Sequence, residues 1–310
     1  MQNLVRGKVE RILFIVSKRI EPMGLAHKKQ NFQDWITQQW VILSGKRIDK
    51  KEQEWLLGPF GNTNGIGLKF INQLAEKEQL VIDNSNKDIG LIQSINQLNL
   101  PEDELNGLSK NVIDFYENTA NYDFDLIVKW NPFFKVFGRL LKILFSNRIE
   151  QLNVPIENIK DSKALKSEII HLLNAETREV KRIIWLRRFK TTGQVVYSGI
   201  YETCKIPSGQ ACIKAIFPLP NGNATVILSP GVGQNGELIL KSSGEKFGDS
   251  GFYFLLNDPK GNLWAKYIKS FKDKLVASSE NDKIIVEQTL TLWNLNVLKF
   301  EYNIKKTTIT

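Results

Sequence analysis

The stretch QVVYSGIYETCKIPSGQACIKAIFPLPNGNATVIL, residues 194–228, decides the fold that the sequence predicts. Its apolar and polar residues largely alternate with a period of two, which is typical of β-strands. Two turn sequences interrupt it, one at residues 207–209 and one at residues 220–223, and the second contains Asn-Gly, a strong hairpin signal. We therefore predict three consecutive antiparallel strands at residues 194–206, 211–217 and 224–228.

The same pattern extends in both directions from this stretch. Strands are also expected at residues 122–130, 168–173, 182–189, 237–241, 252–256, 283–293 and 295–304. Residues 263–277 fit either a helix or a long strand, and the spacing of Trp264, Ile268, Phe271 and Leu275 favours the helix. About nine strands after Pro155, without alternating helices, predict an α+β fold whose antiparallel sheet is strongly curved, either barrel-like or a sandwich.

Helical spacing dominates the first half of the chain. Helical segments are expected at residues 1–57, 66–78 and 108–120. A strongly amphipathic helix is expected at about 131–152, where Lys135, Arg139 and Lys142 share one narrow side and apolar residues cover the rest. We expect this helix to cover the sheet, and the alternatives are an anionic membrane surface or the groove of a partner helix.

Two regions follow from these patterns: a helical N-terminal region, residues 1–106, packed on an α+β antiparallel-sheet domain, residues 107–310. The sequence leaves the role of residues 1–54 open. The N-terminus lacks the small-residue cleavage site of a secretory signal, and no run of about 20 apolar residues exists. We therefore expect a cytoplasmic protein, with association with a membrane as the alternative.

The charge of the chain does not identify a partner. Its 42 Lys and Arg against 33 Asp and Glu give a net charge of +9, but this charge is spread along all 310 residues. Because no nucleic-acid-binding motif accompanies it, we do not expect nucleic acid to be a partner. An apolar ligand or an anionic membrane surface is the expected partner, and the oligomeric state is left open.

Motifs for metals and cofactors are missing from the sequence. Cys204 and Cys212 flank a turn and face each other if that turn makes a hairpin, but no histidine lies near them. The glycines at residues 58–67 match neither a phosphate loop nor a dinucleotide fingerprint. His27 and His171 are isolated. We therefore predict no metal site and no cofactor.

If the sheet closes, one of its faces points into a cavity that would suit a ligand with an apolar body and a polar head. A carboxylate such as Glu202 inside it would have a raised pKa and could perform acid–base chemistry. The alternative is that the polar side chains of these strands form cross-strand pairs on the solvent face of the sheet, and that Asp249 is a turn residue. The candidate ligand-binding residues are Arg187, Tyr197, Tyr201, Glu202, Lys214, Asp249 and Tyr253.

Several runs carry a resemblance to known sequences: FYENTANYDFDLIVKW from Phe115, FGRLLKILFSNRIEQLNVP from Phe137, VVYSGIYETCKIP from Val195, FPLPNGNATVIL from Phe217 and SSGEKFGDSGFYFLL from Ser242. Over residues 55–304 the chain resembles an uncharacterised bacterial family of hypothetical proteins. More distantly, the order of features is similar to a domain of unknown function sometimes fused to saccharopine-dehydrogenase-like reductases. The glycine fingerprint of such reductases is absent from this sequence. The resemblance therefore implies one integrated α+β module and supplies no catalytic residue.

Three functions are compatible with these patterns. The first is non-enzymatic binding of an apolar small molecule or a lipid in the cavity of the curved sheet. The second is a barrel-type enzyme, an isomerase, cyclase or hydrolase, that uses a carboxylate and a tyrosine. The third is an accessory protein that acts through partners. No motif distinguishes them, and none names the ligand.

Overall fold

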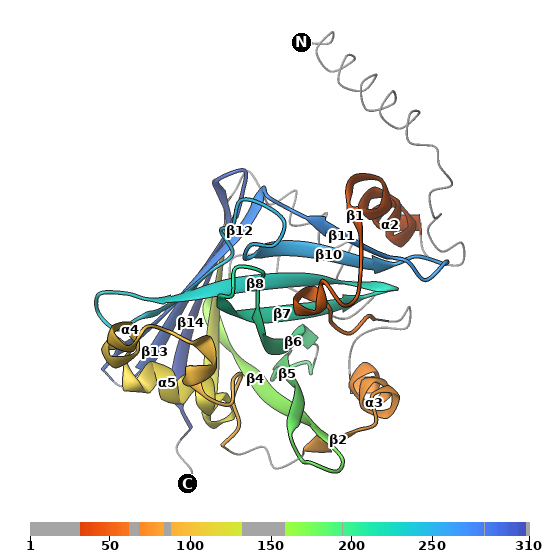
Figure 1. Ribbon diagram of the computed structural model, residues 1–310. Helices are drawn as coiled ribbons and strands as arrows, with labels where there is room; N and C mark the ends of the chain where they lie inside the picture. The colour runs from red at the N-terminus through yellow and green to blue at the C-terminus, as the bar shows by residue number, and fades with distance from the viewer. Residues whose placement is uncertain are drawn as a thin grey trace.

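The protein is built around a large antiparallel sheet that closes on itself (Figure 1). The computed structural model describes residues 32–61, 68–83, 88–131, 159–193, 195–281 and 283–307. Its helices are α2 (Phe32–Ser44), α3 (Leu68–Lys77), α4 (Glu102–Gly107) and α5 (Lys110–Glu117), with the short 3-10 helices η1 (Glu54–Leu56), η2 (Ile95–Leu98) and η3 (Thr119–Asn121).

Ten strands form the closed barrel, and each pairs with its neighbours in antiparallel fashion. In chain order they are β3 (Tyr122–Trp130), β4 (Ile159–Asn174), β5 (Val180–Phe189), β6 (Val195–Lys205), β7 (Ala211–Leu219), β8 (Gly222–Val232), β9 (Leu238–Lys241), β12 (Phe271–Glu280), β13 (Lys283–Leu292) and β14 (Leu295–Lys306). The pairing of β14 with β3 and the pairing of β9 with β8 complete the ring.

The sheet forks at β8. One edge of this strand pairs with β7, while its other edge is shared between β10 (Gly251–Asn257) and β9. β10 then continues through β11 (Leu263–Tyr267) to β1 (Lys46–Ile48), which together form an extension outside the barrel. A further short strand, β2 (Leu80–Asp83), pairs with the end of β4.

The hairpin turns follow from residues that tolerate a positive φ. Asn221 has a φ of +59° between β7 and β8, and Gly236 has a φ of +78° between β8 and β9. Asn221 belongs to the Asn-Gly pair that predicts the first hairpin, and Gly236 follows Asn235 in a second such pair. Both hairpins are present. Trp293 and Asn294, at +50° and +62°, join β13 to β14, and two consecutive positive values are typical of a type I′ turn.

Helices cover the barrel at one end and on one side. η2 and α5 pack Ile95, Leu98, Val112 and Phe115 into the same core cluster as the inward-facing strand residues. Figure 1 shows this segment across one end of the barrel. On the outer face, α3 packs against Ile184, Ile200 and Ile216, a row of cross-strand neighbours on β5, β6 and β7.

These observations confirm the predicted α+β fold with a barrel-like antiparallel sheet. The expected helix at residues 263–277 is wrong: the segment forms β11 and β12, with a turn at residues 268–270. Its apolar residues fit both periods, and pairing with β10, β13 and β9 selects the extended form. The amphipathic helix predicted at about 131–152 falls almost entirely outside the described residues.

The boundary predicted between residues 106 and 107 stays a prediction. The region before it contributes strands β1 and β2 to the sheet in addition to helices. Among the residues that the structure describes, no helix combines the length and the apolar character needed to cross a bilayer.

Candidate functional site

The barrel encloses a cavity of about 80 Å³. Its wall is mostly apolar and is built from inward-facing residues of strands all around the barrel, while Leu91, Phe115 and Tyr116 close it at one end. Alternation along each strand explains this wall, because residues two apart share a face: Val226 and Leu228 face inward, and Ile227 packs in a cluster outside the barrel. The polar side chains in the wall are Tyr116, Arg187, Tyr201, Asp273, Gln288 and Tyr302.

Arg187 is the cationic group of the cavity. Its side chain lies on β5 two residues after Trp185, and it is only 5% exposed. The guanidinium donates a hydrogen bond of 3.1 Å from Nη1 to the hydroxyl of Tyr302 and lies 4.0 Å from the centroid of the Trp185 ring. A guanidinium over an indole face is a favourable cation–π arrangement, and it is strongest away from water. Aromatic rings and a phenol therefore hold this charge in place.

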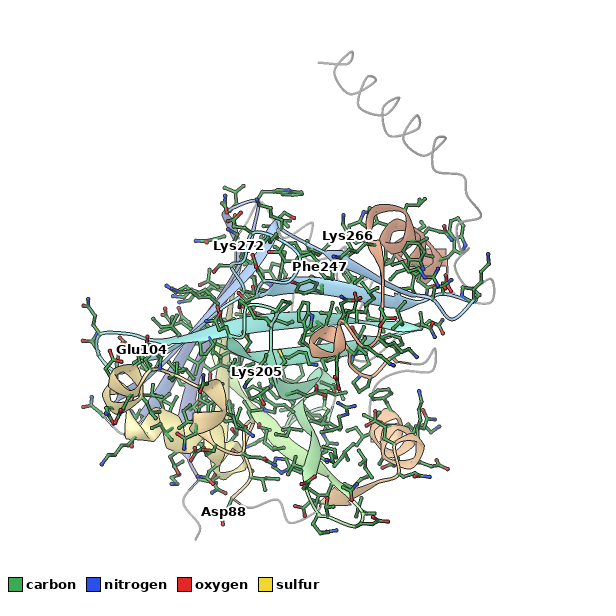
Figure 2. The ribbon with its side chains drawn as sticks, in the orientation of Figure 1. Asp88, Glu104, Lys205, Phe247, Lys266 and Lys272 are labelled. Carbon is green, nitrogen blue, oxygen red and sulfur yellow. The ribbon has the colours of Figure 1, made fainter. Side chains whose placement is uncertain are left out.

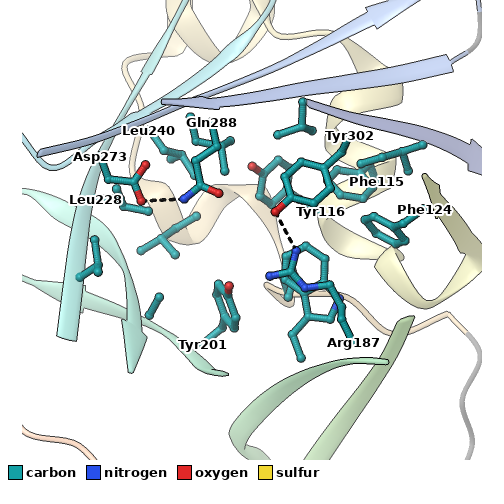
Figure 3. Close-up of a pocket in the computed structure, with 18 of the residues that line it drawn as sticks. Phe115, Tyr116, Phe124, Arg187, Tyr201, Leu228, Leu240, Asp273, Gln288 and Tyr302 are labelled. Atoms are coloured by element: carbon teal, nitrogen blue, oxygen red, sulfur yellow. Dashed lines mark hydrogen bonds between the residues drawn. The ribbon is translucent and has the colours of Figure 1, made fainter. Parts of the chain in front are cut away.

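Asp273 is the acidic group of the cavity, and it lies apart from Arg187 (Figure 3). It is 6% exposed, and its Oδ2 accepts a hydrogen bond of 2.7 Å from Nε2 of Gln288. Burial raises the pKa of Asp273 to about 7, although the hydrogen bond from Gln288 acts in the opposite direction. The carboxyl group is therefore present in both protonation states near neutral pH.

The backbone of Asp273 is fixed by Ser242, the residue that follows β9. Oγ of Ser242 lies 2.7 Å from the backbone nitrogen of Asp273, and the backbone nitrogen of Ser242 donates to the Asp273 carbonyl at 2.8 Å. Within the described part of the chain, Oδ1 of Asp273 has no hydrogen-bond partner. A buried acceptor left in this way typically costs about 1–3 kcal/mol.

Two aromatic side chains complete the polar wall. Tyr201 packs against Trp185 with ring centroids 5.6 Å apart, and burial raises the pKa of Tyr116 well above its ordinary value. The phenol of Tyr116 therefore stays neutral at physiological pH. The cavity thus offers a permanent cation, a carboxyl group that titrates near neutrality, and hydroxyl groups, each surrounded by apolar wall. Such a setting suits binding of a small molecule and also acid–base chemistry.

The structure brings two of the predicted site residues together in this cavity, Arg187 and Tyr201. Tyr197 pairs with Arg187 in the β5–β6 ladder, and its side chain lies outside the described part of the structure. Glu202 and Lys214 lie on the outer face of the barrel and do not line the cavity. Tyr253 lies on β10, outside the barrel, and Asp249 lies two residues before that strand.

Glu202 and Lys214 belong to a charged cluster that also contains Glu78 and Arg182. Arg182 pairs with Glu202 and, at 2.9 Å, with Glu78 at the end of α3, while Lys214 lies 3.0 Å from Glu202. Lys214 also donates to the carbonyl of Leu57 at 2.7 Å. Every charge in this cluster has an opposite charge beside it. We call these four residues the outer cluster.

Asp249 and Tyr253 hold a turn. Oδ2 of Asp249 accepts hydrogen bonds from the backbone nitrogens of Glu245 and Lys246 at 2.9 and 3.1 Å. The hydroxyl of Tyr253 donates to the Asp249 carbonyl at 2.5 Å and accepts from the backbone nitrogen of Gly248 at 3.1 Å. These contacts correspond to the turn role that was the alternative for Asp249.

Asp273 and Gln288 were not among the predicted site residues. Gln288 lies in a strand that was predicted, but Asp273 lies in the segment predicted to be a helix. The sequence signal for Asp273 is its place in the alternating pattern of β12. Asp273 shares one face of this strand with Phe271, Leu275 and Ala277, and it is the only charged residue of these four. An acidic residue in the apolar phase of a strand indicates a buried carboxyl group.

The histidine and cysteine residues of the described chain lie in structural positions. Nε2 of His171 is 3.0 Å from the Gly90 carbonyl, and burial lowers the pKa of this imidazole. Cys204 and Cys212 are free and directly opposite each other on β6 and β7, and burial raises their pKa values to about 11 and about 12. Within the described ranges, no three His, Cys, Asp or Glu side chains gather closely enough to hold a metal ion.

Comparison with known proteins gives one distant relative. No family model matches the chain, and no solved structure matches it. The chain is 22% identical over 267 residues to the protein described as "Uncharacterized membrane protein YndJ" of Bacillus subtilis (strain 168). The match covers 86% of this chain and 46% of that protein, so the chain spans less than half the length of this relative.

The relative agrees with the predicted resemblance to uncharacterised proteins. It does not link the chain to saccharopine-dehydrogenase-like reductases, and the absence of a matching family model gives that link no support either.

Proposed function

We propose that the protein binds a small molecule with an apolar body and a polar group inside the barrel. One observation carries this proposal: the cavity inside the barrel has apolar walls and two separate polar positions, Arg187 with Tyr302 and Asp273 with Gln288 (Figure 3). Natural ligand sites combine a largely apolar lining with a few polar groups that fix orientation.

The size of the cavity favours a small molecule over a whole lipid. A water molecule needs roughly 10–15 Å³ of such space, so about 80 Å³ accommodates roughly five to eight groups of that size. Pockets for drug-sized ligands are larger, about 300–1,000 Å³. Binding of a lipid would require the barrel to open around the cavity.

The proposal is tested by filling the cavity. Purified protein is analysed by native mass spectrometry and by solvent extraction, and binding of small apolar compounds is followed by calorimetry. Val226→Phe places a ring in the cavity and should abolish binding. Val276→Phe makes the same change on β12, outside the cavity lining, and should leave binding intact. Equal binding by both variants would contradict a site inside the barrel.

A second candidate function, association with an anionic membrane, is favoured by the exposed face of α2. This helix packs Val41 and Ile42 against the extension of the sheet. The ring of Trp40 contacts Phe254 of β10 at its edge, with centroids 5.9 Å apart, yet Trp40 is 41% exposed and Ile36 is 47% exposed. Nζ of Lys266 lies 5.9 Å from the centroid of the Trp40 ring. Figure 2 shows Lys266 next to α2. Tryptophan with neighbouring cations is characteristic of helices that lie in the headgroup region of a bilayer.

The relative in Bacillus subtilis is described as a membrane protein, which points the same way. We place this contact at the cytoplasmic leaflet, where anionic lipids concentrate. The test is co-sedimentation with vesicles that contain or lack phosphatidylglycerol. Replacing Ile36 and Trp40 by Ser should abolish binding, whereas replacing Trp293 and Leu295, which are also exposed, should not. Vesicle binding that survives the α2 substitutions would exclude this surface.

The enzymatic alternative now depends on a different carboxylate. Neither Glu202 nor Asp249 lies in the cavity wall, whereas Asp273 does, together with Tyr201 and Tyr302. A carboxyl group whose pKa lies near neutral pH is suited to give and take a proton. Asp273→Asn would then abolish turnover and spare ligand binding, which separates an enzyme from a binding protein.

A further inference from the structure

Hydrogen-bond donors converge on one side of the cavity. The guanidinium of Arg187 donates to the hydroxyl of Tyr302, so the proton of that hydroxyl is left to donate, and within the described residues it meets no acceptor. The hydroxyl of Tyr116 also makes no hydrogen bond within the described chain, yet it is not sealed off from the cavity that Tyr116 lines. Figure 3 shows both hydroxyls and the guanidinium pointing toward the interior of the barrel.

We infer that this side of the cavity binds the carboxylate of a short aliphatic acid. The inference rests on the proposed binding function and adds the chemical class of the ligand. A guanidinium carries five N–H donors, so Arg187 can keep its bond to Tyr302 while both groups donate to the carboxylate. The hydrocarbon chain lies against the apolar wall, where Figure 3 shows Leu228 and Leu240 across from Arg187. The size of the cavity limits the ligand to roughly five to eight non-hydrogen atoms.

A carboxylate fits this position better than the other common polar groups. It accepts at both oxygens and donates nothing, which complements a guanidinium and hydroxyl groups whose protons are unused, and its hydrogen bonds to a guanidinium are strong ones. An ammonium group would place a second cation beside Arg187, and like charges repel each other in a buried cavity. A phosphate group carries close to two negative charges, whereas Arg187 is the one cation among the described residues that line the cavity.

The acidic group of the cavity does not occupy this position. Asp273 lies at the wall away from Arg187, and its carboxyl group accepts a hydrogen bond from Gln288 (Figure 3). Burial raises the pKa of the Tyr116 phenol, and the phenol of Tyr201 is close enough to add to this effect. A phenol that keeps its proton remains a donor. The side of the cavity around Arg187 therefore offers a positive charge and hydroxyl groups to an anion.

The test uses three probes with the same number of non-hydrogen atoms: pentanoate, pentanamide and hexylamine. Their affinities for the full chain are measured at neutral pH by calorimetry, with ligand-observed NMR for the weakest. Pentanoate should bind about 10- to 100-fold more tightly than pentanamide, which has the same shape and no charge, because hydrogen bonds between charged groups are the stronger ones. Hexylamine should bind most weakly of the three, since its cation would lie beside Arg187.

Two substitutions remove the donors one at a time. Arg187→Met keeps an unbranched apolar side chain and removes the guanidinium, whereas Tyr302→Phe removes one hydroxyl and keeps the ring. The advantage of pentanoate over pentanamide should disappear in Arg187→Met and fall about 10-fold in Tyr302→Phe, while pentanamide still binds to both variants. The matched control, Arg188→Met, removes the neighbouring guanidinium, which pairs with Glu168 and does not line the cavity, and it should keep the full advantage. Circular dichroism checks that the variants are folded, and Tyr302→Phe decides alone if Arg187→Met is not.

The outcomes separate the inference from the function on which it rests. If pentanamide or hexylamine binds as tightly as pentanoate, the carboxylate site is wrong and the binding cavity stands. If the advantage of pentanoate persists in every folded variant, or is lost in Arg188→Met as well, another part of the molecule recognises the carboxylate and the assignment to Arg187 and Tyr302 fails. If none of the three probes binds, both the carboxylate site and the proposed binding function are wrong.

Discussion

The outer cluster and the cavity place similar charged groups in opposite situations. On the outside, Arg182 lies between Glu78 and Glu202, and Lys214 contacts Glu202, so each charge has an opposite charge beside it. Inside, the hydrogen bond to Asp273 comes from a neutral amide, and that from Arg187 goes to a phenol. Paired charges stabilise one arrangement of the chain. A buried carboxyl group with only a neutral partner remains able to titrate and to bind.

The largest expected difference between the two regions is in pH dependence. Folding raises the pKa of Asp273 from 3.8 to about 7, so the folded state holds a proton that the unfolded state has lost between these values. The stability gained by protonation is present at low pH and is lost as the pH rises from about 4 to 7. At 1.36 kcal/mol for each pH unit, the loss is about 4 kcal/mol.

This loss is measured by urea unfolding of Asp273→Asn and the native chain between pH 3 and pH 8. The variant should gain about 4 kcal/mol relative to the native chain over this range. For Glu168→Gln, the pH dependence of the free energy of unfolding relative to the native chain should have the opposite sign. Burial opposes ionisation of Glu168, but its pairs with Lys166 and Arg188 lower its pKa, so its contribution is lost as the pH falls below about 4.5. A pH profile of Asp273→Asn parallel to that of the native chain would show that Asp273 is ionised throughout.

The next effect concerns the outer cluster itself. The side chain of Lys214 is 4% exposed and bonds to Glu202 and to two backbone carbonyls, so Lys214→Met leaves buried acceptors without a donor. Breaking a buried ion pair costs about 3 kcal/mol. Lys181→Met removes an exposed pair with Glu179 of similar length and should cost less than about 0.5 kcal/mol. Urea unfolding at neutral pH compares them, and equal losses would mean that the outer cluster contributes no more than a surface pair.

The contrast between the two regions explains what the sequence could predict. The period-two pattern located most barrel strands because their residues alternate in burial, and β3 extends over the predicted residues 122–130. Closure of the barrel was left open between two architectures, since it depends on pairing between β3 and β14, far apart in the chain. No local pattern records that contact.

The face of the strands that points into the barrel was harder to predict, because β5, β6 and β7 are apolar on both faces. Ile200 packs beneath α3 on the outside, while Tyr201 lines the cavity. Neighbouring residues of a strand face opposite sides, so only one of Tyr201 and Glu202 can line the cavity, but periodicity could not say which face was inside. Burial of the outer face depends on α3 and on the segment near η1, whose docking the local sequence does not reveal.

The smallest of the expected effects tests how the cavity holds its cation. Tyr302→Phe removes the hydroxyl that accepts the 3.1 Å hydrogen bond from Arg187 and leaves the ring in place. Loss of a hydrogen bond to a charged donor should cost about 1.5 kcal/mol. The guanidinium of Arg187 also lies over the ring of Trp185. If the guanidinium moves when the hydroxyl is lost, the fluorescence of this indole should change. The neighbouring residue Glu301 lies on the outer face of β14 and pairs with Lys129 near the surface. Glu301→Gln should lower the free energy of unfolding by less than about 0.5 kcal/mol and leave the fluorescence unchanged. If Tyr302→Phe leaves both stability and fluorescence unchanged, the hydrogen bond from Tyr302 does not fix the position of Arg187.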